Sequence, residues 1–291
     1  MEKKVVFIIN PKAGVKKKMD IPAFIKEHFS SEINYDIIIW KNKDDFKNIQ
    51  QQILEGKYTI AVAVGGDGTV NQIAQTVNHT DIALGILPFG SGNGLARSIG
   101  VPMDTKGALD LIAKGKTKKI DSGLINEVPF FCTSGVGFDA HIGTLFASNT
   151  KRGLKSYIKI NWNEFFSYKA QDYKLIVDGK EENVNAFLIA FANAGQYGNN
   201  FYIAPQATMN DGIIDISVLK PFGLPSAIGL LRKILARKAN LSKHIQSFSG
   251  KEIKLIRNEA GPFHFDGEPG ITGAEIVVKV VPNSLNVISN S

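Results

Sequence analysis

Apolar runs and helical patterns alternate over the first 120 residues. The predicted strands are residues 5–9, 35–40, 59–64 and 82–87, which are short and largely apolar. The predicted helices are residues 20–29, 46–54, 71–77, 95–98 and 106–113. Asp44 and Thr105 are expected to cap two of these helices. Buried strands separated by helices predict an α/β domain with a parallel sheet covered on both faces.

Beyond residue 120 the pattern changes to shorter strands, most of which alternate between apolar and polar residues. The predicted strands here are residues 173–177, 184–192, 213–219, 252–256, 263–265, 275–281 and 285–288. Asp178-Gly179 lies between the first two of them and is a hairpin signal. The pattern predicts an antiparallel sandwich or barrel with inserted helices. We therefore expect one domain over residues 1–120 and a β-rich domain over 121–281, with the tail 282–291 a candidate to return to the first.

The composition is that of an ordinary globular protein, with 44% hydrophobic and 21% charged residues in a chain of 291. No run approaches the ~18 apolar residues of a membrane span. The apolar run 5–9 is shorter than a signal-peptide core of roughly 7–15 residues. The single cysteine, Cys132, excludes an internal disulfide and a thiolate metal cluster. These features predict a cytoplasmic protein.

Basic residues outnumber acidic ones by 34 to 27, which gives a net charge of +7. A nucleic acid, an anionic membrane surface or a polyphosphate substrate would suit this charge, and so would a plain solvated surface. The lysines are dispersed and the aromatic residues match no RNA-binding motif, so we expect no nucleic-acid partner. Charge alone does not choose among the other three.

A glycine-rich loop, Gly-Gly-Asp-Gly-Thr at 65–69, follows the predicted strand 59–64 and leads into a helix. Glycines let the backbone approach a phosphate closely, and a helix start presents N–H groups without helical partners. The carboxylate of Asp67 would repel a phosphate, so it is interpreted as a partner of magnesium or of a hydroxyl group. The loop matches neither the Walker nor the Rossmann pattern. A tight strand-to-helix turn is the alternative interpretation.

Two loops of similar character follow other predicted strands. Residues 10–14 read Asn-Pro-Lys-Ala-Gly, and residues 88–94 read Pro-Phe-Gly-Ser-Gly-Asn-Gly. Either loop alone could be a plain turn. The carboxyl ends of parallel strands meet at one edge of an open sheet, where ligands bind. Three glycine loops at that edge therefore predict a nucleotide site.

Taken together, these three motifs resemble the diacylglycerol kinase catalytic-domain family, which includes bacterial lipid kinases, sphingosine kinases and ceramide kinases. The matching motifs are Asn10-Pro11-x-Ala13-Gly14, Gly65-Gly66-Asp67-Gly68-Thr69 and Gly90-Ser91-Gly92-Asn93. The resemblance covers nearly the whole chain. It implies a first domain similar to that of NAD kinases and phosphofructokinases, a β-sandwich second domain, ATP bound between the two, and phosphorylation of a lipid hydroxyl.

On this resemblance, thirteen residues of the three loops are expected to bind ATP. They are Asn10, Lys12, Gly14, Gly65, Gly66, Asp67, Gly68, Thr69, Asn71, Gly90, Ser91, Gly92 and Asn93. The next position is Gly94, where many bacterial diacylglycerol kinases have Asp, and this looks more like the sphingosine-kinase side of the family. The acceptor is therefore left open among a diacylglycerol, a monoacylglycerol, a sphingoid base and phosphatidylglycerol.

Residues 263–270 form a predicted strand that ends in an acidic turn, Asp266-Gly267-Glu268. Phosphoryl transfer to a hydroxyl needs an acceptor for its proton and a cation for the phosphates. Glu268 is a candidate base on this reasoning, and the family's Asp-Gly-Glu motif, whose Glu is placed at the catalytic centre, falls on it. Asp67 is the alternative base, or a partner acting through a magnesium-bound water. His264 is interpreted as a packed or exposed strand residue.

The stretch 210–215, Asn-Asp-Gly-Ile-Ile-Asp, reads as a turn into a strand. Such a turn could also offer a carboxylate and carbonyl oxygens to a hard cation. Bacterial members of the family carry a structural magnesium at the matching stretch. The resemblance thus implies Asp211, with backbone oxygens of Thr208 and Ile213, as metal ligands. Asp121 is interpreted either as part of an acidic network or as a turn cap.

Two segments, 151–169 and 228–238, have the pattern of basic amphipathic helices. Such helices can lie in an anionic membrane interface. A helix with one face on the core and a basic face in solvent would give the same pattern. We expect the lipid substrate to be met at the membrane surface, and peripheral membrane attachment stays open.

The sequence thus predicts a lipid kinase that uses ATP and Mg²⁺. One alternative is a kinase of a soluble acceptor such as NAD or a sugar. A second is a non-catalytic protein that binds a nucleotide or a lipid. The oligomeric state is not predicted.

Overall fold

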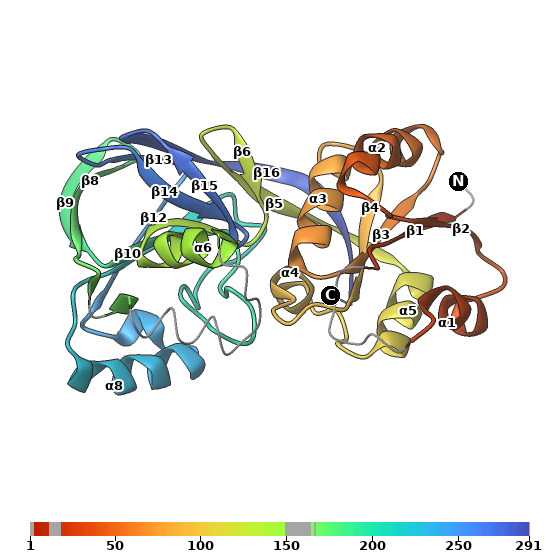
Figure 1. Cartoon of the computed structure of the whole chain (residues 1–291), viewed down its shortest axis with the longest axis horizontal. Helices are drawn as coiled ribbons and strands as arrows, with labels where there is room; N and C mark the ends of the chain where they lie inside the picture. The colour runs from red at the N-terminus through yellow and green to blue at the C-terminus, as the bar shows by residue number, and fades with distance from the viewer. Residues whose placement is uncertain (1–2, 12–18, 149–163, 166, 291) are drawn as a thin grey trace. The chain divides into compact units, whose positions relative to one another are not determined.

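The computed structural model describes the whole chain except residues 1–2, 12–18, 149–163, 166 and 291 (Figure 1). The chain forms two compact units. The first contains Met1–Asp121 together with Pro282–Ser291, and the second contains Ser122–Val281. Most of the first amphipathic segment predicted at 151–169 lies outside the described residues.

A parallel sheet forms the centre of the first unit. Its first four strands are β1 (Lys4–Ile9), β2 (Asn34–Ile39), β3 (Ile60–Gly65) and β4 (Ala83–Pro88), in the order β2-β1-β3-β4. All three pairings among them are parallel. Every residue of β3 and β4 is buried, as expected for strands with helices on both faces. This confirms the predicted fold class of the first half.

The helices of the first unit lie on both faces of this sheet. They are α1 (Ile21–His28), η1 (Lys43–Asp45), α2 (Phe46–Glu55), α3 (Asp67–Val77), α4 (Gly94–Ser98) and α5 (Thr105–Lys114). Figure 1 shows α2 and α3 on one face and α1 and α5 on the other.

Two predicted caps are wrong by one residue. Asp104 caps α5 by accepting a hydrogen bond from the Gly107 amide, and Asp45 holds the N-cap position of α2.

Twelve further strands complete the chain, and β5 and β16 each begin in one unit and end in the other. The strands are β5 (Lys116–Ile125), β6 (Val128–Phe130), β7 (Thr133–Gly137), β8 (Gln171–Val177), β9 (Lys180–Ala186), β10 (Leu188–Ala192), β11 (Ile214–Leu219), β12 (Ile245–Gly250), β13 (Glu252–Ile256), β14 (Gly261–Phe265), β15 (Glu268–Thr272) and β16 (Glu275–Ser289). The last part of β16 pairs in parallel with β4, Val287 opposite Leu84.

The second unit is an antiparallel sandwich. One layer has the order β16-β13-β8-β9, and the other has the order β12-β11-β10-β7-β14-β15. A shared core lies between them, with Leu175 and Ile253 from the first layer and Phe191 and Ile216 from the second. Two inserted helices, α6 (Phe138–Ser148) and α8 (Leu224–Leu235), and a short turn, η2 (Ala239–Leu241), also belong to this unit. The sandwich with inserted helices was predicted.

Three predicted strands are divided differently in the structure. The run 184–192 is two strands, because the chain passes from one layer to the other at Phe187 between β9 and β10. The runs 275–281 and 285–288 are one strand, β16, because its first half pairs with β13 and its second half with β4. At Phe187 the local pattern of apolar residues shows no break, whereas the second change of partner falls near residues 282–284, Pro-Asn-Ser, which separate the two predicted runs.

Candidate functional site

The three glycine loops leave the same edge of the first unit's sheet. In the parallel register, Ile9 of β1 lies opposite Val64 of β3, and Gly65 of β3 lies opposite Pro88 of β4. The carboxyl ends of these strands are therefore level, and the loops that follow them start side by side. This edge is where open α/β sheets bind ligands.

Asp67 joins the second loop to the third. Its Oδ2 accepts a hydrogen bond from the Asn93 amide at 3.0 Å, and its Oδ1 accepts one from the Gly94 amide at 2.7 Å. Asp67 is also the first residue of α3, where a carboxylate is favoured by the helix dipole. The predicted start of this helix at residue 71 is wrong, because the helix begins inside the glycine motif. The amides of its first turn, which include those of Gly68 and Thr69, have no partner within the helix.

The glycines of these loops are needed for the loops to pack on each other. A Cβ added at Gly90 would lie 2.8 Å from the Cα of Gly66, and one added at Gly92 would lie 2.8 Å from Asp67 Oδ2. Asn93 closes the third loop in a left-handed conformation. Its Oδ1 accepts from the Gly90 amide and its Nδ2 donates to the Gly90 carbonyl, both at 2.9 Å. The two loops therefore form one compact backbone surface.

The first loop is tied to the second by Asn10. Its Nδ2 donates to Thr69 Oγ1 at 3.0 Å. Lys12 and Gly14, also predicted to bind ATP, lie outside the described residues. Asn71 is buried on α3, where Gln75 Nε2 donates to its Oδ1 at 2.6 Å. Ser91 is exposed. The structure thus joins residues of all three loops into one cluster through side-chain hydrogen bonds.

Glu268 lies on a hairpin with a two-residue turn in the second unit. Asp266 and Gly267 form the turn with φ angles of +48° and +85°, and Glu268 begins β15 opposite Phe265. Positive φ at both turn residues is the conformation that suits the twist of antiparallel strands. The Glu268 side chain is exposed, so its carboxylate is accessible to a bound molecule.

Asp266 anchors the tip of this hairpin. Its carboxylate accepts hydrogen bonds from three successive backbone amides, those of Phe131, Cys132 and Thr133, at 2.7 to 3.0 Å. Hydrogen bonds to an ionised acceptor are among the strongest in proteins. This role was missed from the sequence, because the amides belong to a segment more than 130 residues away.

Arg257 fixes the base of the same hairpin. Its guanidinium donates five hydrogen bonds to carbonyl oxygens of Gly261 and Pro262 on one strand and of Thr272 and Gly273 at the end of the other. Burial lowers the pKa of this group. Since the planar guanidinium carries five N–H donors, it can span both strand ends at once. The hairpin that presents Glu268 is therefore held at its tip and at its base.

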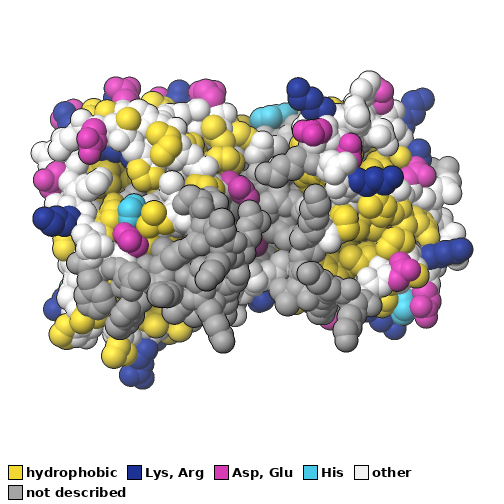
Figure 2. Space-filling model, viewed as in Figure 1, with side chains coloured by type: hydrophobic (Ala, Val, Ile, Leu, Met, Phe, Trp, Pro, Cys, Tyr) yellow, Lys and Arg dark blue, Asp and Glu magenta, His cyan; other side chains and the backbone are white. Residues whose placement is uncertain are grey.

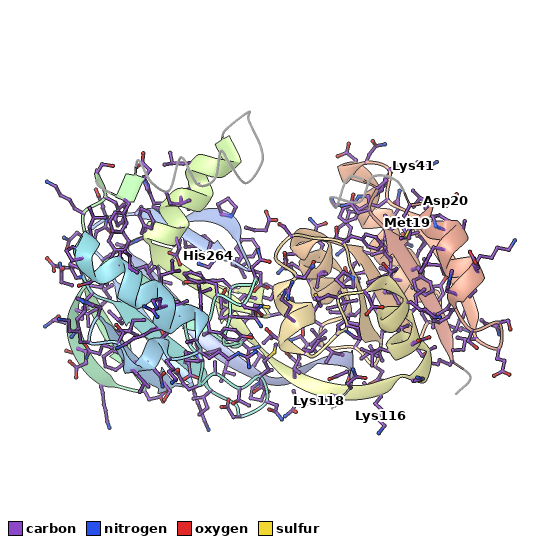
Figure 3. All side chains as sticks on the ribbon, turned by 90° about the horizontal axis from the view of Figure 1, so that it is seen from below. Met19, Asp20, Lys41, Lys116, Lys118 and His264 are labelled. Carbon is purple, nitrogen blue, oxygen red and sulfur yellow. The ribbon has the colours of Figure 1, made fainter. Side chains whose placement is uncertain are left out.

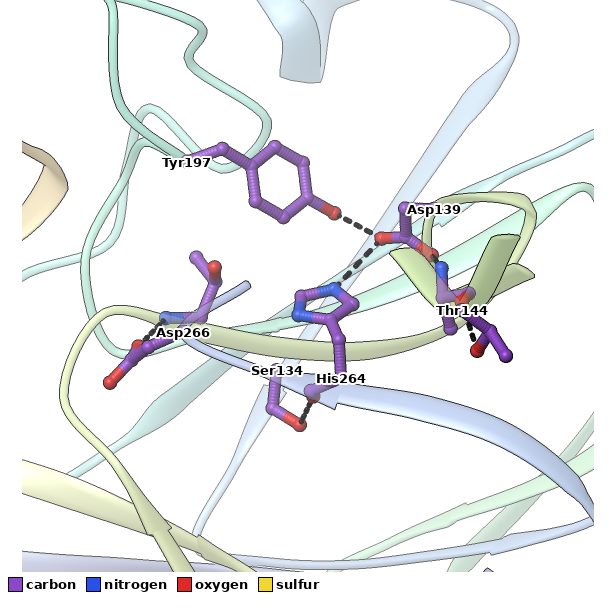
Figure 4. A network of polar contacts seen from close by, with 8 residues as sticks. Ser134, Asp139, Thr144, Tyr197, His264 and Asp266 are labelled. Carbon is purple, nitrogen blue, oxygen red and sulfur yellow. Dashed lines mark hydrogen bonds and ion pairs between the residues drawn. The ribbon is translucent and has the colours of Figure 1, made fainter. Parts of the chain in front are cut away.

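His264 connects β14 to α6 through a third contact. Its Nε2 lies 3.1 Å from Asp139 Oδ2, which also accepts a hydrogen bond from the Tyr197 hydroxyl at 2.7 Å (Figure 4). The His264 side chain is only 5% exposed and lies beside α6 (Figure 3). Burial and the charge of Asp139 raise the pKa of nearby Tyr168 to about 12. His264 is a packed residue whose partners hold the strand that carries the acidic turn.

The predicted metal ligands lie in the turn before β11. Asp211 Oδ1 accepts a hydrogen bond from the Ile213 amide at 3.1 Å, and Thr208 Oγ1 donates to the Gln206 carbonyl. The neighbouring Asp215 is buried, and desolvation together with the charge of Asp211 raises its pKa. In the part of the chain that the structure describes, no three His, Cys, Asp or Glu side chains gather in a metal-binding cluster.

Asp121 connects two strands within the first unit. Its side chain is buried, and its Oδ1 accepts a hydrogen bond from the Asn283 amide at 2.8 Å, which joins β5 to β16. Among the described residues, no helix has the length and apolar character needed to cross a membrane.

Comparisons with known proteins agree with this fold. The family described as "Diacylglycerol kinase catalytic domain" matches residues 4–125, and the one described as "YegS C-terminal NAD kinase beta sandwich-like domain" matches residues 133–289. A probable lipid kinase, YegS-like, from Chromohalobacter salexigens is 27% identical over 80% of this chain and 76% of its own.

Two solved structures share the fold over almost the full length. A putative diacylglycerol kinase from Bacillus anthracis has a TM-score of 0.78 at 23% identity, over 99% of this chain and 97% of its own. An NAD kinase from Archaeoglobus fulgidus in complex with ATP has a TM-score of 0.53 at 14% identity, over 99% of this chain and 94% of its own. On the evidence of its two matched domains, the chain belongs to the diacylglycerol kinase catalytic-domain family, with a C-terminal domain of the YegS type.

Proposed function

We propose that this protein is a lipid kinase that transfers the γ-phosphoryl group of ATP to the hydroxyl of a diacylglycerol or a sphingoid base. The observation that carries the proposal is the cluster of three glycine loops at one sheet edge, tied together by Asn10, Asp67 and Asn93. Membership in a kinase family and a YegS-like relative named as a probable lipid kinase support it.

In this proposal the loop amides bind the phosphates of ATP. The backbone N–H groups at the start of α3 project from the helix N-terminus, which favours anions. Gly66 and Gly90 pack closely on each other. Since glycine has no side chain, their backbone can approach a ligand directly. Both oxygens of Asp67 already accept amides, and the lone pairs that remain can still face a cation or a water.

Glu268 is proposed as the base. The hydroxyl oxygen of the lipid forms a bond to the γ-phosphorus, the bond from that phosphorus to the bridging oxygen breaks, and ADP leaves. The hydroxyl proton passes to the Glu268 carboxylate. A carboxylate held on a fixed hairpin can be positioned for this transfer with little reorganisation.

Magnesium is the cation implied by the kinase reaction, where it neutralises charge on the phosphates. For a structural ion, the donor set at Asp211 fits, because one carboxylate and backbone oxygens are the ligands that hard cations prefer. A cation there would also offset the repulsion that raises the pKa of Asp215. We therefore propose Thr208, Asp211 and Ile213 as its ligands.

The acceptor class is tested by transfer of radiolabelled phosphate from ATP. The purified full chain is incubated with a total lipid extract in detergent and, separately, with NAD and simple sugars. We expect label in the lipid fraction only, and mass spectrometry of the new phospholipid identifies the acceptor. Label on NAD or a sugar would favour a soluble acceptor, and no transfer with ATP bound would favour a non-catalytic binding protein.

Glu268→Gln tests the proposed base. The amide cannot accept the proton, so we expect turnover to fall about 10²- to 10⁴-fold while ATP affinity changes little. Because Glu268 is exposed, the melting temperature should stay the same. Turnover within a few-fold of the parent would remove Glu268 from this role.

A further inference from the structure

The outer face of α8 exposes large apolar side chains. Leu224, Ile228, Leu231 and Leu235 follow each other at intervals of four, three and four residues, which places them along one side of the helix. All four are exposed, Ile228 by 71%. Leu241 of η2 is 65% exposed. These five residues are called the α8 face below.

The helix is already anchored by a neighbouring side, because the buried residues Leu230 and Ile234 each come one position before an exposed leucine. Leu230 and Ile234 are buried and pack in the second core of the sandwich unit, together with Leu188 and Leu219. Lys233 Nζ donates to the Leu241 carbonyl at 2.7 Å, which holds the turn after the helix against it. An amphipathic surface helix normally places polar residues on the side away from the core. The α8 face departs from that rule.

The exposed large apolar side chains are concentrated in the α8 face. The described residues include nine exposed large hydrophobic side chains, and five of them form the α8 face. Figure 2 shows hydrophobic side chains beside Lys and Arg at the lower edge of the second unit, where Figure 1 places α8.

The positive charge of the chain is concentrated in the same segment. Residues 216–251 hold seven of the 34 Lys and Arg residues and none of the 27 Asp and Glu residues. Without this segment, 27 basic residues balance 27 acidic ones, so the segment accounts for the whole net charge of +7. Arg232, Lys233, Arg237, Lys238 and Lys243 on and after α8 are all exposed.

We propose that the α8 face docks on an anionic lipid bilayer. Apolar side chains of an interfacial helix enter the boundary between head groups and acyl chains, while flanking Lys and Arg bind anionic head groups. A second copy of the chain is a poor occupant, because a symmetric contact through this face would bring the two basic segments together. A nucleic acid would match the charge and leave the apolar stripe in water.

This inference deepens the proposed function and rests on it for the purpose of docking, which is to bring the enzyme to a lipid acceptor. The docking itself is measured without ATP or acceptor. The full chain is sedimented with vesicles of phosphatidylcholine alone and with vesicles that also contain roughly 30% phosphatidylglycerol. We expect at least tenfold tighter binding to the anionic vesicles, and weaker binding at high salt, because each Lys or Arg near the surface contributes about fivefold.

Two variants separate the apolar and the basic parts. Ile228→Ser with Leu231→Ser should weaken binding to anionic vesicles about tenfold or more, and Arg232→Gln with Lys238→Gln should remove most of the preference for anionic lipid. The matched control is Leu54→Ser, which changes an exposed apolar residue of α2 in the other unit. It should bind vesicles like the parent. All these side chains are exposed, so melting temperatures should not change.

The proposal is overturned if the parent shows no preference for anionic vesicles, or if the Ile228 and Leu231 variant binds them like the parent. It is also overturned if sedimentation shows a dimer that the same variant abolishes. Transfer to a short-chain acceptor below its micelle concentration is the separate readout of the proposed function. Docking without transfer would contradict the kinase proposal alone. Transfer without docking would contradict the membrane-docking proposal alone.

Discussion

Asp67 uses one carboxylate to hold two glycine loops in register. Each of its oxygens accepts a backbone amide, and those two amides follow each other in the third loop. A carboxylate among glycines is therefore explained in part by loop architecture. Its proposed role toward magnesium or a water adds to this contact and does not compete with it, since each oxygen keeps a second acceptor position.

Asp67→Asn tests that contact. The new NH₂ group would face one of the two backbone amides, so one bond would be replaced by a repulsive contact between donors. We expect ATP affinity and turnover both to fall, with kcat/KM reduced about 10²-fold or more. Asp110→Asn, at an exposed position on α5, is the control. Unchanged ATP affinity in the Asp67 variant would argue against the loop-bridging role.

Asp215→Asn tests the buried acid beside Asp211. Burial raises its pKa in the folded protein, so the folded state favours the neutral form and stability falls as pH rises above the ordinary value of 3.8. The variant should therefore melt at a higher temperature than the parent at pH 7 in EDTA. The difference should shrink to nothing toward pH 3.8. A lower melting temperature at pH 7 would contradict this account.

At the scale of elements, the hairpin of β14 and β15 is fixed at both ends. Asp266 binds three amides at its tip, and Arg257 binds carbonyls of both strands at its base. His264 adds a buried contact to α6 between them. The position of Glu268 is thus set by residues that need not touch a substrate.

Asp266→Asn tests this arrangement. Asn accepts positive φ, so the turn is retained, whereas the charge and one acceptor for the three amides are lost. We expect a loss of about 1.5–3 kcal/mol in stability and a fall in kcat larger than the change in KM for ATP. Melting curves and steady-state kinetics measure the two. A variant as stable and as active as the parent would show that the anchor is not needed.

At the scale of the whole molecule, the C-terminal segment completes the first unit. Three of its side chains are at most 2% exposed, those of Leu285, Val287 and Ile288. Val287 pairs with Leu84, so the segment lies beside β4 in the sheet. Burial of three such side chains contributes roughly 5–9 kcal/mol, which is comparable to the total stability of many domains.

Removal of residues 282–291 should therefore unfold the first unit. We expect hydrogen exchange in β1, β3 and β4 to lose its protection and ATP binding to disappear, while the sandwich strands β10 and β11 stay protected. A chain that lacks only residues 290–291 is the control and should behave like the parent. Intact protection of β4 in the shorter chain would show that the first unit is stable without this strand.

The sequence by itself determined the strands β1 to β4, the helices that follow them and the three loops of the first unit, but not β5 or the start of α3. Strands with every residue buried, such as β3 and β4, leave a continuous apolar run, and a glycine loop leaves a motif that can be read locally. The Asp178-Gly179 hairpin, with both φ angles positive, was predictable for the same reason. These signals are local, because they depend on side chains within a few positions of each other.

Tertiary structure decided which distant groups meet. The amides that bind Asp266, the partner of Asp121 on β16, and the exchange of sheets at Phe187 all depend on chain segments far apart in the sequence. It also decided that Leu230 and Ile234 of α8 are buried while Ile228 and Leu231 face solvent. An apolar pattern shows that a helix has an apolar side, and only packing against the sheet shows how much of that side is covered.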